Sequence, residues 1–174
     1  MTKKLHNRVN REVLLQRLQH DTTPRTTISF YKYAHIGNPS LFRDHLYLLL
    51  EPIGVLGRIY VAHEGVNAQI SAPTAHMEEF RKTLDQITFL EGCRLNVAIE
   101  DNGKSFFKLA IKVREKIVAD GLDDKSFDVT QCGKHVSAQE FNALAEDANT
   151  IIVDMRNHYE SEVGHFKNAI TPDV

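Results

Sequence analysis

Cysteine is scarce in this sequence, and long apolar runs are absent. The 174 residues include only Cys93 and Cys132, which are too few for a disulfide framework and lack metal-ligand spacing. The longest apolar candidate, residues 46–50, is far shorter than the roughly 18 residues that a membrane helix needs. The N-terminus is basic but has no apolar segment typical of a secretory signal. We therefore expect a protein of the reducing cytoplasm, with no membrane contact.

The charges that are present divide unevenly along the chain. Apolar residues make up 42% and charged residues 25%, which is a globular composition with enough apolar material for a core. The net charge of −2 hides a split: residues 1–118 carry 17 Lys and Arg against 12 Asp and Glu, whereas residues 119–174 carry 4 against 11. This asymmetry predicts two units with different partners. The alternative is that a basic and an acidic unit attract each other.

Apolar spacing over residues 1–118 predicts an α+β domain. After a helix over residues 9–20, strands and helices follow in the order strand, helix, strand, strand, helix, strand, which is a ferredoxin-like (acylphosphatase-like) βαββαβ sandwich. Two helices are expected to cover one face of an antiparallel sheet, the first of them capped by Asn38 with Pro39 at its first position. The expected strands are 26–33, 55–62, 66–71, 95–99 and 107–114, and the second covering helix follows Pro73.

Basic residues and tyrosines share the sheet face that points away from these helices. Lys108, Lys112 and Arg114 alternate with apolar residues of the last strand, and Tyr31 and Tyr33 lie on the outward side of the first. Cations meet phosphates and aromatic rings stack on unpaired bases, so this face predicts RNA binding. The alternative is that it packs against the acidic second unit. The other polar residues expected there are Thr27, Ser29, Asn67, Gln69, Arg94 and Asn96.

A short hairpin turn carries His63 and Glu64, with Asn67 just beyond it. A histidine and a carboxylate there could do acid–base chemistry or hold RNA. The alternative is turn chemistry, in which Gly65 supplies the backbone conformation and Asn67 forms a local hydrogen bond. No metal site is predicted, because the sequence supplies no further ligands.

Residues 119–135 are expected to be a linker, rich in Asp and Gly, before a second unit at 136–174. Ser137 and Glu140 form a capping box. The apolar run 151–153 is typical of a buried parallel strand. Because such a strand needs neighbours, and none follow in the sequence, the second unit is expected to be an incomplete α/β domain.

The second unit resembles the start of a rhodanese domain, and the whole chain resembles one family. That family is the rhodanese-containing tRNA uridine(34) hydroxylases, formerly an uncharacterised protein family. The rhodanese signature is matched by Asp154, Arg156, Glu160, Gly164, His165 and Ala169. The other matching segments are HNR at 6–8, PRTTISFYKY at 24–33, AHEGVNAQI at 62–70, GKSF at 103–106, KVR at 112–114 and IVADG at 117–121.

The resemblance implies oxygen-dependent hydroxylation of the wobble uridine of tRNA to 5-hydroxyuridine. The implied partners are tRNA and, as co-substrate, molecular oxygen; no other cofactor is evident. It also implies a catalytic cysteine in a rhodanese loop that lies beyond Val174, and neither Cys93 nor Cys132 matches it. The chain is therefore expected to be truncated within the rhodanese domain and inactive on its own. Asp154 and Arg156 either orient that loop, form a structural ion pair, or cap a short helix expected at 158–162.

Two other functions stay open from the sequence. One is a rhodanese-type sulfurtransferase, in which the absent cysteine carries sulfur to an acceptor. The other is a non-catalytic module that binds RNA or a partner protein.

Overall fold

The structure is a computed structural model that describes residues 5, 9–99, 103–117, 128, 130–131 and 133–172. The chain forms two compact units, Met1–Gln131 and Cys132–Val174, and the boundary falls inside the predicted linker 119–135, most of which lies outside the described residues. Within the described parts, no helix is long and apolar enough to cross a membrane.

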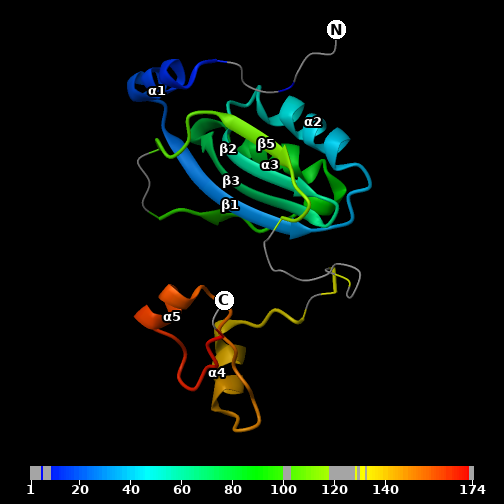
Figure 1. Ribbon diagram of the computed structural model, residues 1–174, viewed down its shortest axis with the longest axis vertical. Helices are drawn as coiled ribbons and strands as arrows, with labels where there is room; N and C mark the ends of the chain where they lie inside the picture. Colours follow the sequence, from blue (N-terminus) through cyan, green and yellow to red (C-terminus); the bar gives the residue numbers. More distant parts are fainter. Residues whose placement is uncertain are drawn as a thin grey trace. The chain divides into compact units, whose positions relative to one another are not determined.

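A five-stranded sheet with the order β4-β1-β3-β2-β5 forms the first unit (Figure 1). The first four strands have the order and antiparallel pairing of a ferredoxin-like sheet, so the predicted α+β fold is confirmed. The expectation of a wholly antiparallel sheet is wrong, because β5 pairs with β2 in parallel. The chain leaves β4 at the end of the sheet where β2 begins, so the next strand runs in the direction of β2. The strands are β1 (Arg25–Tyr33), β2 (Leu56–Ala62), β3 (Gly65–Pro73), β4 (Asn96–Val97) and β5 (Leu109–Val113).

Helices α2 (Pro39–Leu50) and α3 (Met77–Asp85) cover one face of this sheet (Figure 1). The predicted cap of α2 is confirmed: the Asn38 side chain accepts a hydrogen bond from the Leu41 N–H. Ahead of α3, Pro73 is followed by the 3₁₀ turn η1 (Thr74–His76), and a second such turn, η2 (Thr88–Leu90), follows α3. Helix α1 (Arg11–His20) precedes β1. The core between helices and sheet includes Ile28, Phe30, Leu46, Leu50, Ile59, Ile70, Phe80 and Leu84.

The fourth strand is shorter than the sequence predicts. Only Asn96 and Val97 pair with β1, and the Ala98 N–H makes the last hydrogen bond, to the Thr27 carbonyl. Ile99, at the end of the expected strand 95–99, lies beyond this pairing and is 99% exposed. Likewise, Phe107 precedes β5 and does not belong to the core.

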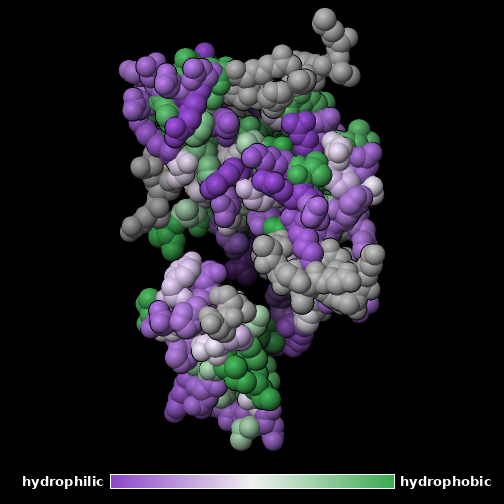
Figure 2. All heavy atoms as spheres, viewed as in Figure 1, coloured by the Kyte–Doolittle hydropathy of each residue, from purple (hydrophilic) through white to green (hydrophobic). Residues whose placement is uncertain are grey.

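The second unit contains α4 (Ala138–Glu146) and α5 (His158–Val163). The predicted capping box of Ser137 and Glu140 starts α4. The expected buried strand at 151–153 is reduced to one parallel bridge between Val153 and Ile170. Hydrophobic atoms gather on the surface of this unit in Figure 2. The prediction that residues 151–153 are buried is wrong, because no further strand of the described residues covers them. The exposed apolar residues of the second unit include Ile151, Val153, Met155, Phe166 and Ile170.

Candidate nucleic-acid interface

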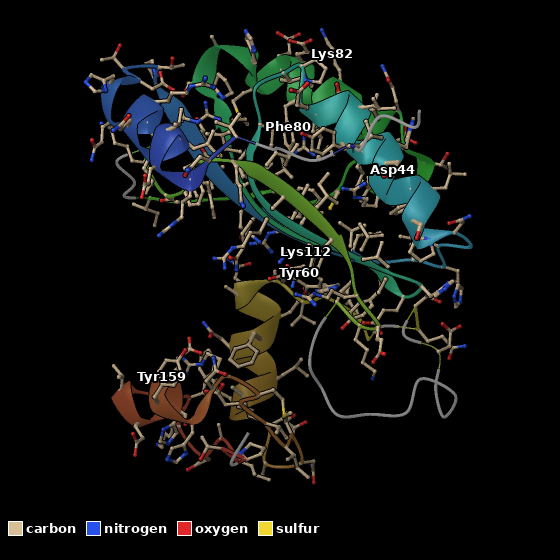
Figure 3. The ribbon with its side chains drawn as sticks, turned by 45° about the horizontal axis from the view of Figure 1, so that its top comes forward. Asp44, Tyr60, Phe80, Lys82, Lys112 and Tyr159 are labelled. Carbon is tan, nitrogen blue, oxygen red and sulfur yellow. The ribbon has the colours of Figure 1, made fainter. Side chains whose placement is uncertain are left out.

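The strand register places three of the predicted RNA-binding residues, Tyr31, Asn67 and Lys112, in one row across the outer face of the sheet, the face opposite α2 and α3. Tyr31 pairs with Asn67, Asn67 with Tyr60, and Tyr60 with Lys112. Neighbouring strands lie about 4.8 Å apart, so three steps from Tyr31 to Lys112 span roughly 14 Å. Figure 3 shows Tyr60 and Lys112 together on this face, with Phe80 on the helix side of the sheet.

A second row runs beside the first and contains a cation that the sequence reasoning missed. Ser29 pairs with Gln69, Gln69 with Arg58, and Arg58 with Ala110. Neither Arg58 nor Tyr60 had been placed on the outer face from the sequence. The alternation of β2 could have identified both, because Ile59 and Val61 are fully buried and their neighbours must point outward.

Lys108, Lys112 and Arg114, here called the basic stripe, follow β5 along this face. Lys108 and Lys112 line one groove with Arg58 and Tyr60, and the Arg114 guanidinium carbon lies 5.3 Å from the centroid of the Tyr60 ring. All three stripe residues are exposed. The structure thus places them together, as the alternation predicted.

Tyr31 and Tyr33 form an aromatic pair on β1. Their ring centroids are 6.3 Å apart with the planes at 76°, an edge-to-face arrangement. Tyr31 is 59% exposed. An exposed ring beside polar groups offers a surface on which an unpaired base can stack.

The hairpin residues His63, Glu64 and Asn67 each make a hydrogen bond to the backbone of another segment, and one oxygen of Glu64, Oε2, is buried without a hydrogen-bond partner among the described residues. The Glu64 carboxylate accepts a hydrogen bond from the Ile117 N–H at 2.6 Å, and the Asn67 amide donates to the Ile117 carbonyl at 3.2 Å. Nδ1 of His63 donates to the Ile36 carbonyl at 2.9 Å. Glu64 is only 6% exposed, so the expected RNA contact does not fit Glu64. Of the turn interpretation, the left-handed backbone at Gly65 is present, but the expected local hydrogen bond of Asn67 is wrong, because its partner Ile117 lies 50 residues away.

The residues of the rhodanese-like signature lie before, within and after α5, and two of them, Asp154 and Arg156, form an ion pair. Arg156 donates from Nε to Asp154 at 3.0 Å, from Nη2 to the same carboxylate at 2.6 Å, and from Nη2 to the Gly164 carbonyl at 2.6 Å. Glu160 accepts from the Asn157 side chain at 2.8 Å, and Nδ1 of His165 donates to the Ser161 carbonyl at 3.1 Å. Each signature residue thus stabilises the local fold.

Cys93 does not occupy a reactive setting. Cys93 is 6% exposed, and burial raises the pKa of its thiol, which disfavours the thiolate. Cys132 lies outside the described residues. Across the described residues, no cluster of three or more His, Cys, Asp or Glu is placed to hold a metal ion.

The Asp154–Arg156 pair predicts a specific acid response. Hydrogen bonds from the Arg156 side chain and backbone lower the pKa of Asp154 to about 2, from 3.8. The pair therefore stabilises the second unit above about pH 4, and this contribution is lost as the pH falls through about 2. We expect NMR titration of the Asp154 carboxyl to give a midpoint near 2. A titration midpoint near 4 instead would show that the pair does not form. In a second measurement, hydrogen exchange of the Ile170 amide should be faster in Asp154→Asn than in the parent chain at neutral pH.

Sequence comparison identifies the family to which this fold belongs. The profile described as "UPF0176 acylphosphatase like domain" matches residues 25–117. The chain belongs to the UPF0176 family. The match runs from the start of β1 to Ile117, the residue that Glu64 and Asn67 hold against the hairpin.

Curated relatives of this UPF0176 chain carry the name tRNA uridine(34) hydroxylase. One from Leptospira interrogans is 53% identical over 168 residues, which cover 97% of this chain and 46% of the relative. One from Escherichia coli strain SE11 is 52% identical over 167 residues, covering 95% of this chain and 48% of the relative. The chain thus spans about half the length of the curated relatives it matches.

Proposed function

We propose that this chain is the RNA-facing part of a tRNA uridine(34) hydroxylase. In the full-length protein, the wobble uridine of tRNA is converted to 5-hydroxyuridine, with molecular oxygen as co-substrate, in the cytoplasm. The observation that carries this proposal is the identity of 52–53% over nearly the whole chain to relatives with that name. At this level of identity the polar surface is expected to share its role with the relatives.

The outer face of the sheet supports the proposal from its chemistry. In our proposal, the basic stripe contacts phosphates, and Tyr31 and Tyr33 offer stacking surfaces to unpaired bases of the anticodon loop. Glu64 and Asn67 act indirectly, because they fix the segment that leaves β5 at Ile117.

Residues 1–174 are proposed not to catalyse the reaction by themselves. This part of the proposal is supported by the family resemblance, which implies a catalytic cysteine beyond Val174, and by the burial of the Cys93 thiol. The described part of the chain contributes substrate binding in this proposal, and the reacting group comes from the remainder of the full-length protein.

The test is mass spectrometry of tRNA nucleosides from cells that lack the full-length gene. We expect 5-hydroxyuridine and the bases derived from it to disappear. The full-length gene should restore them, and a gene for residues 1–174 should not. Loss of thiolated bases instead would indicate a sulfurtransferase, and an unchanged nucleoside profile would indicate a non-catalytic binding module.

A further inference from the structure

A groove of about 350 Å³, here called the β2–β5 groove, lies over the paired strands β2 and β5 and the segment before β5, on the outer face of the sheet. Its walls include Arg58 and Tyr60 from β2, Lys112 from β5, and Phe107 and Lys108 from the segment before β5. The Gly57 N–H donates to the Lys108 carbonyl at 2.9 Å and holds that segment against β2. Ala110 pairs with Arg58 and lines the groove with a single methyl group, which leaves the hollow open.

The groove carries positive charge without acidic compensation. Arg58, Lys108 and Lys112 line it, and none of the described lining residues is acidic. Within the described chain, none of these three cations takes part in an ion pair. Three cations around one hollow repel each other and attract an anion. The charge therefore points to a ligand that carries phosphate.

Aromatic rings in the walls of the groove provide stacking surfaces, which a ligand made of phosphate alone would not need. Tyr60 and Phe107 are half-buried wall residues outside the core. The Lys108 ammonium lies 5.7 Å from the centroid of Phe107, and Arg114 lies over Tyr60. Rings and guanidinium planes together form the stacking surfaces that bind unpaired bases of RNA.

We propose that the β2–β5 groove binds one unpaired nucleotide of single-stranded RNA, with its base against Tyr60 and Phe107 and its flanking phosphates on Arg58 and Lys112. The volume of about 350 Å³ lies at the small end of the range for ligand pockets, about 300–1,000 Å³, which suits a single nucleotide. The inference rests on the proposed function in that RNA is the ligand, but it adds a specific nucleotide pocket in which Arg58, Tyr60 and Phe107 join the predicted Lys112.

Fluorescence titration separates base binding from general attraction to phosphate. The probes are a labelled hairpin RNA with an unpaired loop and its stem alone as a blunt duplex. Tyr60→Leu should weaken hairpin binding by about tenfold through lost stacking and leave duplex binding within about twofold. Arg58→Gln should weaken both RNAs, because it removes a phosphate contact. Uridine monophosphate should displace the hairpin at lower concentration than inorganic phosphate does.

Matched variants control for charge, ring loss and folding. Tyr159→Leu removes an exposed ring from α5, and Lys82→Gln removes an exposed cation from α3 on the helix side of the sheet; both should bind as the parent chain does. Tyr60→Phe keeps the ring and should retain hairpin affinity. Photocrosslinking of the parent chain with a 4-thiouridine loop should modify the peptides containing Tyr60 or Phe107, which tests the pocket without any variant.

Three results would overturn the pocket. Equal losses of hairpin and duplex affinity in Tyr60→Leu would show that the groove contacts RNA phosphates but does not bind a base. Crosslinks confined to other peptides would place the loop elsewhere. Unchanged RNA affinity in both Tyr60→Leu and Arg58→Gln would show that the groove does not bind RNA and would favour a protein partner instead. None of these readouts requires turnover, so a failure of the hydroxylase proposal in the nucleoside assay is distinguishable from a failure of the pocket.

Discussion

Replacing Lys108, Lys112 and Arg114 together with alanine is expected to weaken tRNA binding by roughly 100- to 1,000-fold at about 0.1 M salt. Each cation that neutralises a phosphate contributes nearly one unit to the log–log salt slope, so the slope should shrink by roughly two to three. The measurement is titration of labelled tRNA at several salt concentrations with the 174-residue chain.

The geometry of β5 is the reason for this expectation. Leu109 and Ile111, on the other side of the strand, are buried at 4% and 5% exposure under the helices. The stripe must therefore face outward, where side chains two residues apart along a strand are spaced by about 7 Å. Lys112 and Arg114 have this spacing, whereas Lys108 precedes Lys112 by four residues, or about 14 Å, so the stripe can contact phosphates along an RNA strand that are not all consecutive.

A single-charge comparison controls for the change in net charge. Lys112→Ala should reduce the salt slope by about one, whereas Lys82→Ala should leave it unchanged. Lys82 is 70% exposed and pairs only with the exposed Glu78, so its loss has little structural effect. If the triple variant keeps its tRNA affinity and slope but binds residues 132–174 more weakly, the stripe is an interdomain surface.

Gly65→Ala is expected to reduce the free energy of unfolding by about 2–5 kcal/mol. Gly65 has a φ of +148°, which L side chains rarely adopt, and a Cβ there would lie 2.1 Å from the Lys32 carbonyl oxygen. The clash is with backbone of the paired strand β1, so relief requires the sheet itself to shift. The same hairpin positions Glu64 and Asn67, so their hold on Ile117 should weaken as well.

Gly37→Ala is the matched control for this change. Nothing lies within 4 Å of a Cβ at Gly37, and its backbone is not in the left-handed region, so stability should change by less than about 0.5 kcal/mol. Urea unfolding followed by circular dichroism measures both variants. Equal midpoints would contradict the close approach of β1 and β3 at Gly65.

Local chemistry made several elements readable from the sequence. Asn38 and Pro39 start α2, and Ser137 and Glu140 start α4, because a cap depends only on neighbours within one helical turn. The alternation in β1 places Ile28 and Phe30 inward because side chains of a strand must point to opposite faces. These signals were sufficient for the fold class and for the outward direction of the basic stripe.

The make-up of the candidate site depended on tertiary structure. No local pattern states that β5 joins β2 in parallel, yet this pairing alone brings Lys112 beside Tyr60 and Ala110 beside Arg58. The burial of Glu64 likewise depends on Ile117, 53 residues away in the chain. The sequence by itself therefore determined the outward direction of the basic stripe and the starts of α2 and α4, through periodicity and capping. Only the folded sheet decided which of them meet, because strand order and register are set by hydrogen bonds between segments that are distant in sequence.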